Sequence, residues 1–282
     1  MEEAELTRLN ITMQVFVMEQ TKIETAAVTD VGLVRTLNED SIAVVSKDQS
    51  GKAKKGAVLV LADGLGGHNA GEAASKLVTS SLPELYIEAS GMDCASSLFR
   101  AVTACNKMVH EESLTSPVLQ GMGTTVVAVV VVNQYAIFVN VGDSRGYLFR
   151  DGSIIHRTKD HSLKDASVDV PGVSPTNRFS HVLTRAIGPK PNVLIDITTH
   201  RIAKGDVILL CSDGLSDYVS DEEMKEMVSS YPCADAVEVL VDLAKERGGE
   251  DNISAIVANL QEVCIADSAN PHLSGVHRYL VS

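Results

Sequence analysis

Four short segments of this 282-residue chain place carboxylates at the ends of expected apolar strands. They are Asn38-Glu39-Asp40, the run from Asp63 to His68, Ser212-Asp213-Gly214 and Asp251-Asn252. Several carboxylates in one place repel one another, and a bound cation would offset this repulsion. Oxygen donors without a histidine or cysteine partner at suitable spacing favour Mg²⁺ or Mn²⁺ over Zn²⁺. The segments therefore predict a centre for hard divalent metals.

A lone Asp-Gly pair is ordinarily a turn. Here Asp63-Gly64 follows an apolar run at 57–62, and Asp213-Gly214 repeats the arrangement after 207–211. The glycines at 66–67 would let a ligand approach the backbone, whose carbonyl oxygens could also bind metal. Turns alone do not explain this repetition.

Arg35 lies four residues before Glu39. A guanidinium can hold a phosphate oxygen pair through two parallel hydrogen bonds. Two metals that share a carboxylate can activate a water between them. A metal pair, a water and an arginine together indicate hydrolysis of a phosphate ester.

The composition narrows the class of protein. The net charge of −13 argues against a nucleic-acid or anionic-membrane partner. The odd number of cysteines, 5, without a C-x-x-C pair, predicts neither a disulfide framework nor a zinc site and fits a reducing compartment. The acidic N-terminus lacks the apolar core of a signal peptide. The run at 126–132 falls far short of the ~20 residues of a membrane helix, and its valines favour a buried strand. We expect a cytoplasmic monomer.

The elements that must position these residues alternate in blocks. Strands are expected before residue 63, two helices follow at about 70–90 and 93–112, and many strands come next. Two more helices, from Asp221 and at about 234–247, precede a last strand at 253–260. Pro83 should bend or split the first helix. Well-separated groups of strands and helices predict an α+β layered sandwich rather than βαβ alternation.

Three segments have weaker patterns. Residues 1–20 could form an extra edge strand or a frayed end. Residues 159–192 contain four prolines and no steady periodicity, which is typical of a functional loop. Residues 265–282 are expected to be a tail.

The chain resembles the metal-dependent Ser/Thr protein phosphatases of the type 2C family. The matching stretches occur in the family's order: R-T-L-N-E-D (35–40), D-G-L-G-G-H-N-A-G-E-A-A-S (63–75), G-M-G-T-T (121–125), V-G-D-S-R-G (141–146), T-K-D-H-S (158–162), L-T-R-A-I-G (183–188), C-S-D-G-L-S-D (211–217) and G-E-D-N-I-S (249–254). The short first two forms are more similar to the compact bacterial enzymes than to the larger eukaryotic ones. The resemblance implies a four-layer α/β/β/α sandwich of two antiparallel sheets flanked by helix pairs. It also implies a catalytic domain at 21–262, an N-terminal extension at 1–20, and a C-terminal tail at 263–282.

The resemblance also implies a ligand set for two Mn²⁺ or Mg²⁺ ions. Asp63 would bridge both ions, and the Gly64 carbonyl would bind one of them. Asp213 and Asp251 would hold the second ion. A further carboxylate from the first segment, Glu39 or Asp40, would join directly or through a water.

Two further positions match family residues. Asp143 corresponds to a ligand of a third, weaker ion in bacterial relatives, and Arg35 to the arginine that grips the substrate phosphate. Catalysis would rest on Arg35, Asp63 and Asp213, and a flap at about 164–182 would influence substrate choice. Leu65 stands where many eukaryotic relatives have a histidine that protonates the leaving oxygen. A metal-bound water or His68 could substitute.

The implied activity is hydrolysis of phosphoserine and phosphothreonine in proteins, reversing a Ser/Thr kinase in bacterial signalling. The alternatives are a non-catalytic phosphoprotein-binding pseudophosphatase and a phosphatase of small phosphoesters. Plainer interpretations stand beside several site residues. The stretch 143–145 could be a salt-bridged hairpin turn, His161 a structural hydrogen-bonder, and Arg185 a salt-bridge partner that orders the flap. Thr124 and Thr125 would support the centre through their hydroxyls.

Overall fold

A computed structural model describes residues 12–18, 21–46, 56–65, 69–163, 182–263 and 275–280. One antiparallel sheet has six strands in the order β1-β2-β12-β11-β8-β9. Their bounds are β1 Thr12–Met18, β2 Thr21–Asp30, β12 Ile253–Glu262, β11 Val207–Cys211, β8 Arg145–Arg150 and β9 Ser153–Arg157.

The second antiparallel sheet runs β13-β10-β7-β6-β4-β3, with the short strand β5 paired to β4. The bounds are β13 Gly275–Leu280, β10 Leu194–Arg201, β7 Tyr135–Val141, β6 Val126–Val132, β4 Ala57–Leu65, β3 Asp40–Ser46 and β5 Gly123–Thr124. The expected hairpin across Asn133-Gln134 is confirmed in β6 and β7.

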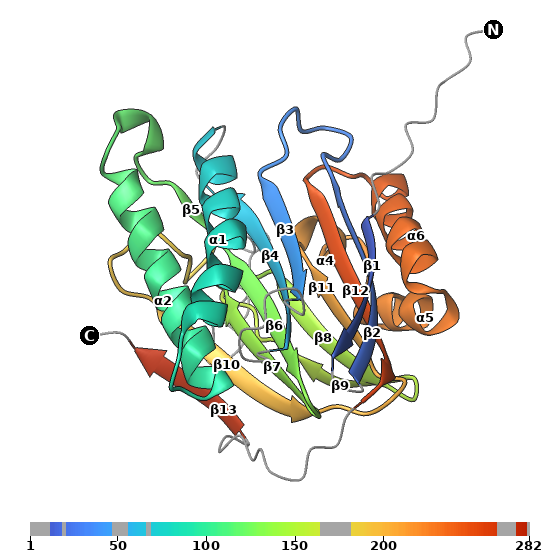
Figure 1. Cartoon of the computed structure of the whole chain (residues 1–282). Helices are drawn as coiled ribbons and strands as arrows, with labels where there is room; N and C mark the ends of the chain where they lie inside the picture. Colours follow the sequence, from blue (N-terminus) through green and yellow to red (C-terminus); the bar gives the residue numbers. More distant parts are fainter. Residues whose placement is uncertain are drawn as a thin grey trace, which may run out of the picture.

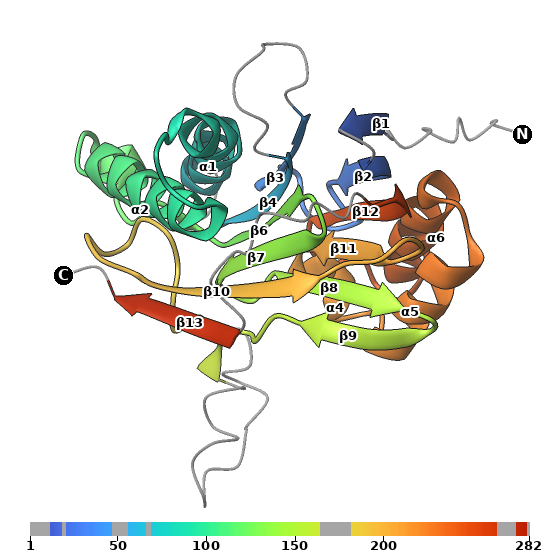
Figure 2. The same cartoon turned by 60° about the horizontal axis from the view of Figure 1, so that its bottom comes forward.

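Helices cover the outer face of each sheet. Helices α1 (Asn69–Glu88) and α2 (Cys94–Ser113) pack on the seven-stranded sheet, followed by the 3₁₀ turn η1 (Pro117–Leu119). Helices α4 (Asp213–Ser216), α5 (Asp221–Ser230) and α6 (Cys233–Glu246) pack on the six-stranded sheet. Figure 2 shows the resulting order of helix pair, sheet, sheet and helix pair. The expected four-layer α/β/β/α sandwich is confirmed.

Alternation along the central strands builds the three apolar layers. In β6, Val126, Ala128 and Val130 face α1 and α2, whereas Val127 and Val129 face the other sheet. Successive strand side chains point to opposite faces. The valine run is therefore apolar throughout because both faces of this strand are buried.

The helix ends follow the expected capping chemistry. Asp93 caps α2 by accepting a hydrogen bond from the Ser96 N–H at 2.9 Å, and Ser220 with Glu223 forms a capping box on α5. Pro83 was expected to bend or split the first helix, and the splitting is wrong, because α1 continues through the proline as one helix. Leu82 and Tyr86, both fully buried, anchor the helix on either side of the proline. This packing outweighs one lost backbone hydrogen bond.

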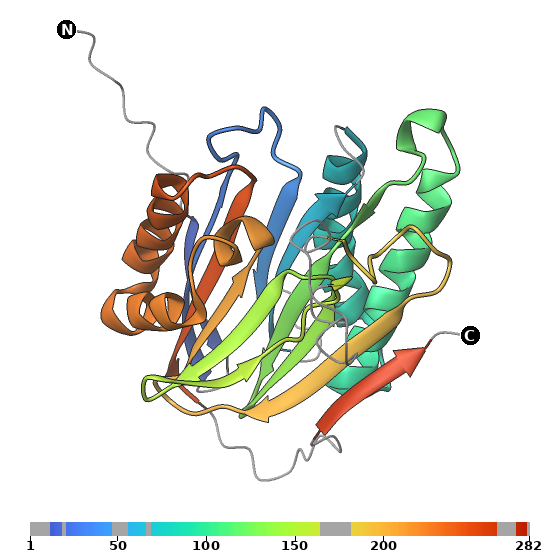
Figure 3. The ribbon, with the colours of Figure 1, turned by 180° about the vertical axis from the view of Figure 1, so that it is seen from behind.

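Both terminal segments contain edge strands. Strand β1 pairs with β2, as one of the two alternatives for residues 1–20 predicts. The prediction that residues 265–282 are only a tail is wrong for 275–280, because β13 pairs with β10 (Figure 3). No helix in the described ranges is long and apolar enough to cross a membrane.

Candidate active site

Asp63 lies within β4, not after it, because the strand continues to Leu65 and pairs there with β5. Its backbone N–H donates to Thr125 Oγ1 at 3.0 Å. Its carbonyl accepts from the Thr125 N–H and from Thr124 Oγ1, both at 2.8 Å. The two threonines thus fix the backbone that carries Asp63, which agrees with the supporting role expected for them.

Asp40 stands directly across from Asp63 in the register of β3 and β4. Like charges at opposed positions of a sheet are destabilising. Burial, then the charges of Asp213, Asp40 and Asp143 and a hydrogen bond with Asp213, raise the pKa of Asp63 well above its usual range. This strand pair therefore brings together two carboxylates that disfavour each other's charge.

The remaining carboxylates converge on this pair from distant segments. Burial raises the pKa of Asp40 to about 8, and the charges of Asp213 and Asp251 add to the shift against hydrogen bonds from Ser254 and Ser212. Burial raises the pKa of Asp143 to about 8, followed by the charge of Asp213. Asp40, Asp63, Asp143, Asp213 and Asp251 thus form one electrostatic cluster, drawn from five separate segments.

The cluster fits hard cations in its donor chemistry. Asp40 is only 5% exposed, and its Oδ1 is buried without a hydrogen-bond partner. A buried, unpaired carboxylate oxygen is costly unless a cation satisfies it. Within the described ranges, no three His, Cys, Asp or Glu side chains already stand together as a formed metal site. A divalent ion would offset the repulsion among these carboxylates, and the oxygen-only donors suit Mn²⁺ or Mg²⁺.

Each Asp-Gly unit needs its glycine for a close backbone approach. A Cβ on Gly64 would lie 2.4 Å from the backbone carbon of Gly71 in the first turn of α1. A Cβ on Gly214 would lie 2.1 Å from the Asn252 carbonyl oxygen. The glycines therefore allow other backbone segments to press against Asp63 and Asp213.

Glu39 joins the centre to α1. Its carbonyl accepts from the Gly64 N–H at 3.1 Å and from Ser75 Oγ at 2.6 Å. Its carboxylate lies against Gly71, with Oε2 2.8 Å from where a Cβ would stand. An anion at the first turn of a helix is favoured by the unpaired N–H groups there. Glu39 therefore faces the helix, whereas Asp40 faces the other carboxylates.

Asn252 holds the segment 31–39 in place, a role that the sequence analysis missed. Its Nδ2 donates to the carbonyls of Val31 and Leu37 at 3.0 and 2.9 Å, and its Oδ1 accepts from the Glu39 N–H at 2.8 Å. Ser254 Oγ lies 2.7 Å from Asp40 Oδ2. The sequence did contain a sign of this role, because Asn252 and Ser254 are polar residues at the start of an otherwise apolar strand.

Arg35 reaches the cluster through Asp251. Its Nη2 donates to Asp251 Oδ2 at 2.7 Å, while the guanidinium side chain keeps 52% exposure. Burial lowers the pKa of Arg35, but Asp251, Glu39 and Asp213 together raise it. Arg35 is thus a cation at the open side of an acidic centre.

The segment Gly142–Arg145 is a crossover between sheets. Strand β7 belongs to the seven-stranded sheet, whereas β8 pairs with β11 and β9 in the other sheet. The interpretation of this segment as a salt-bridged hairpin turn is therefore wrong. Arg145 instead donates to Asp160, with Nη2 at 2.7 Å from Oδ2. Asp143 is left facing the cluster.

His161 ties this crossover to the base of the expected flap. Its Nδ1 accepts from the Gly142 N–H at 3.1 Å, and its Nε2 lies 3.3 Å from Asp196 Oδ2. Arg185 Nη1 donates to Asp196 Oδ1 at 2.7 Å. The structural interpretation of His161 and the salt-bridge interpretation of Arg185 agree with these contacts. His68 and flap residues 164–181 lie outside the described ranges.

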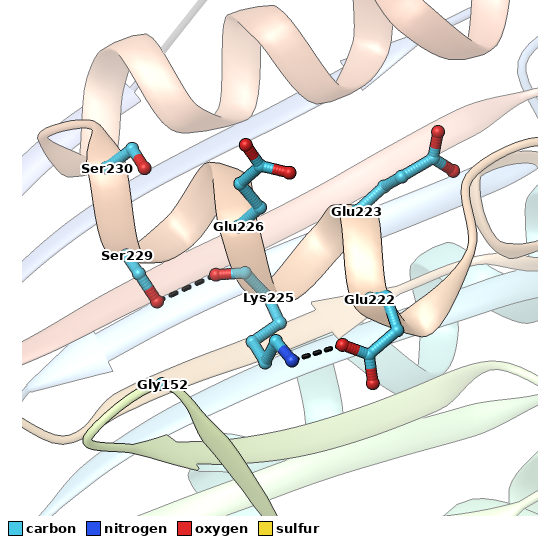
Figure 4. A pocket seen from close by; sticks show the side chains of 7 residues that line it. All are labelled: Gly152, Glu222, Glu223, Lys225, Glu226, Ser229 and Ser230. Carbon is cyan, nitrogen blue, oxygen red and sulfur yellow. Dashed lines mark hydrogen bonds and ion pairs between the residues drawn. The ribbon is translucent and has the colours of Figure 1, made fainter.

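A surface pocket on α5 is separate in composition from this centre. Its lining contains none of the clustered carboxylates: it comprises Gly152, Glu222, Glu223, Lys225, Glu226, Ser229 and Ser230 (Figure 4). Lys225 pairs with Glu222 inside it. This pocket has no phosphate-binding arginine and no unpaired buried carboxylate among its lining residues.

Comparison with known proteins connects the geometry to a family. A family profile described as Protein phosphatase 2C matches residues 26–253. Serine/threonine protein phosphatase PstP of Mycobacterium tuberculosis is 38% identical over 239 residues, which cover 83% of this chain and 44% of PstP. Serine/threonine phosphatase stp of Listeria monocytogenes is 33% identical over 81% of this chain and 92% of its own length.

A solved structure is similar in fold as well. The catalytic domain of PstP in complex with two manganese ions superposes with a TM-score of 0.71 at 38% identity, covering 86% of this chain and 98% of that one. The family match spans all five clustered carboxylates. The chain belongs to the protein phosphatase 2C family.

Proposed function

We propose that this protein is a metal-dependent phosphatase that hydrolyses phosphoserine and phosphothreonine in proteins. The observation that carries the proposal is the convergence of five carboxylates beside the exposed guanidinium of Arg35. The chain spans 44% of the length of PstP, so activity, substrate and partners are inferred from the site itself.

The carboxylates divide by position. Asp63, central to the cluster, would be shared by two Mn²⁺ or Mg²⁺ ions, with the Gly64 carbonyl beside it. Asp213 and Asp251 would hold the second ion, and Asp143 would take a third, weaker one. When bound, such ions lower the pKa of a water and neutralise phosphate charge.

The first acidic segment supplies two different carboxylates. Asp40 has the unpaired buried oxygen, so it is the better candidate for a direct ligand. Glu39 is engaged at the start of α1 and would act through a water. The sequence leaves open which of the two would bind a metal directly, and we assign this role to Asp40.

Arg35 would orient the substrate phosphate. Its guanidinium can present two parallel N–H groups to phosphate oxygens. It now donates to Asp251, so substrate binding would exchange that carboxylate for phosphate. Water adds to phosphorus, the bond to the serine or threonine oxygen breaks, and that oxygen takes up a proton. Leu65, an apolar side chain, cannot donate that proton.

The wider setting is part of the proposal. Residues 21–262 would form the catalytic domain, acting in the cytoplasm of a bacterium as a monomer and reversing a cognate Ser/Thr kinase. The negative net charge and the sequence similarity to bacterial phosphatases support this setting. Residues 164–182 would form the flap that influences substrate choice.

The test is hydrolysis of a phosphothreonine peptide and of p-nitrophenyl phosphate with Mn²⁺, with Mg²⁺ and with EDTA. Wild type is compared with Asp213→Ala and with Asp242→Ala, which removes an exposed carboxylate on α6. We expect metal-dependent turnover that EDTA and Asp213→Ala abolish and Asp242→Ala leaves intact. A folded wild type with no turnover under any metal would instead favour a phosphoprotein-binding role.

A further inference from the structure

The loop between β2 and β3 exposes four large apolar side chains around Arg35. Val31 is 36% exposed, Leu33 61%, Val34 64% and Leu37 42%. Isolated apolar residues on a surface are ordinary, whereas a concentration of them indicates an interaction site. These four lie within seven consecutive residues, at the end of the sandwich where Figure 1 shows the blue loop that leads into β3.

The loop is rigidly held, so the exposure is not that of a loose segment. Asn252 Nδ2 donates to the carbonyls of Val31 and Leu37, at either end of the loop, at 3.0 and 2.9 Å. The Leu33 N–H donates to the Gly249 carbonyl at 2.7 Å. The backbone groups of Val31, Leu33 and Leu37 thus bond to the segment just before β12, whereas the apolar side chains of the loop remain at the surface. A surface fixed before binding loses little entropy when a partner docks.

The loop is also continuous with the proposed phosphate site. Arg35 lies in its middle and contacts Asp251, a member of the carboxylate cluster. Val34 is next to Arg35 in the chain and Leu37 is two positions further on, so a segment whose phosphate reaches Arg35 can contact both side chains. The loop contains no acidic residue between Val31 and Leu37, so it offers basic neighbours no partner of its own.

We propose that the loop is a docking surface for protein segments whose phosphoserine or phosphothreonine has apolar neighbours. This inference rests on the proposed phosphatase activity and adds a substrate class to it. The preference would arise from apolar area removed from water beside the phosphate. A net charge of −13 predicts the competing preference for basic neighbours, because it would attract cationic segments at long range.

The test uses three phosphothreonine peptides with leucine and valine, serine and glutamine, or lysine beside the phosphorylated residue, together with p-nitrophenyl phosphate. We expect kcat/KM for the apolar peptide to exceed that for the neutral polar peptide by about 10-fold, the scale of burying one or two methyl-bearing groups. Val34→Ser should reduce this ratio by about 3-fold or more. Val34→Thr, which conserves volume at a 64% exposed position, should reduce it less and keeps the test valid if the serine variant is unstable.

A matched control removes a similarly exposed valine elsewhere. Val118, 70% exposed in η1, is changed to serine and should leave the ratio unchanged. Equal turnover of the apolar and polar peptides, a preference for the lysine peptide, or an unchanged ratio in both Val34 variants would overturn the docking proposal. Turnover of neither peptides nor p-nitrophenyl phosphate by wild type with Mn²⁺ would instead overturn the phosphatase proposal on which it rests.

Discussion

Two sets of acidic side chains within the same sandwich have opposite environments. In the centre, Asp40, Asp63 and Asp143 face one another and other carboxylates, and the pKa of each is raised. A second set, Asp160, Asp196 and Asp206, is buried as well, but an arginine pairs with each member. Both sets are expensive to bury, and only the second is compensated within the described part of the chain.

The compensated set shows what a structural carboxylate needs. Asp206, with no exposed surface, accepts from Arg150 Nε and Nη2, each at 2.7 Å, and from the Ala203 N–H at 2.8 Å. Asp40 has hydrogen bonds to only one of its oxygens, and its Oδ1 is left without a partner. Incomplete compensation therefore separates binding carboxylates from supporting ones more clearly than burial does.

The largest expected effect comes from Asp63→Asn. Losing the central carboxylate should lower metal-dependent kcat/KM by at least about 10³-fold, because its charge can no longer hold cations at the reacting phosphate. The free energy of unfolding in EDTA should stay equal or rise, because asparagine removes a charge that neighbouring carboxylates disfavour. Both are measured on the same preparation, by peptide turnover and by urea unfolding. A marked loss of metal-free stability would place Asp63 in the structural set.

The reverse pattern is expected for Asp206→Ala. This change leaves Arg150 without its carboxylate and should lower the free energy of unfolding by about 3 kcal/mol, as in other broken buried pairs. Turnover per folded molecule should be unchanged, because Asp206 belongs to the ion pair at the far strand ends rather than to the cluster. Urea unfolding in EDTA and kcat at low temperature measure the two quantities. A loss of kcat without a loss of stability would contradict the division.

Metal should stabilise through the first set only. With Mn²⁺ at 100 times its dissociation constant, one site adds about 2.7 kcal/mol to the free energy of unfolding. EDTA should remove this gain, and Asp213→Ala should reduce it sharply. Asp206→Ala should keep the gain on its lower baseline. Thermal unfolding with and without Mn²⁺ provides the comparison, and an equal gain in all three proteins would show that the metal binds elsewhere.

Local sequence patterns were enough to recognise carboxylates of the centre, but not the carboxylates that pair with arginines. Asp63 and Asp213 are recognisable because each follows an apolar run of the sequence and precedes a glycine, a combination visible within eight residues. Asp206 and Asp160 are ordinary surface-type residues in the sequence. Their arginine partners are 56 and 15 positions away, so only the folded chain identifies the pairs.

The same reason explains where the fold prediction failed. The segment 142–145 has the composition of a tight turn, but β8 finds its partner in β11, more than 50 residues later, and therefore joins the other sheet. Strand β13 likewise depends on pairing with β10. The uninterrupted apolar run at 126–132 predicted β6 correctly, because this pattern lies within the strand's own sequence. Long-range partner choice leaves no comparable local pattern.

The smallest expected effect is the loss, at low pH, of the stability that ionised Asp196 of the second set contributes. Burial opposes ionisation of Asp196, but hydrogen bonds and charges from His161 and Arg185 prevail and lower its pKa from 3.8 to about 2. A carboxylate whose pKa is lowered by folding stabilises the folded state at pH values above its pKa in the unfolded chain. This contribution is lost as the pH falls from about 4 through about 2.

Asp196→Asn should therefore be less stable than wild type at pH 5, by about 1 kcal/mol once solvent screening is allowed for. The gap should narrow at pH 3, because Asp196 of the unfolded wild type then takes up a proton while the folded wild type keeps the charge. Urea unfolding of both proteins in EDTA at the two pH values measures the gap, with Asp242→Asn as the exposed control whose gap should stay near zero. A gap that widened at pH 3 would mean that Asp196 gains stability on protonation, as the unpaired carboxylates of the centre do, and would remove it from the compensated set.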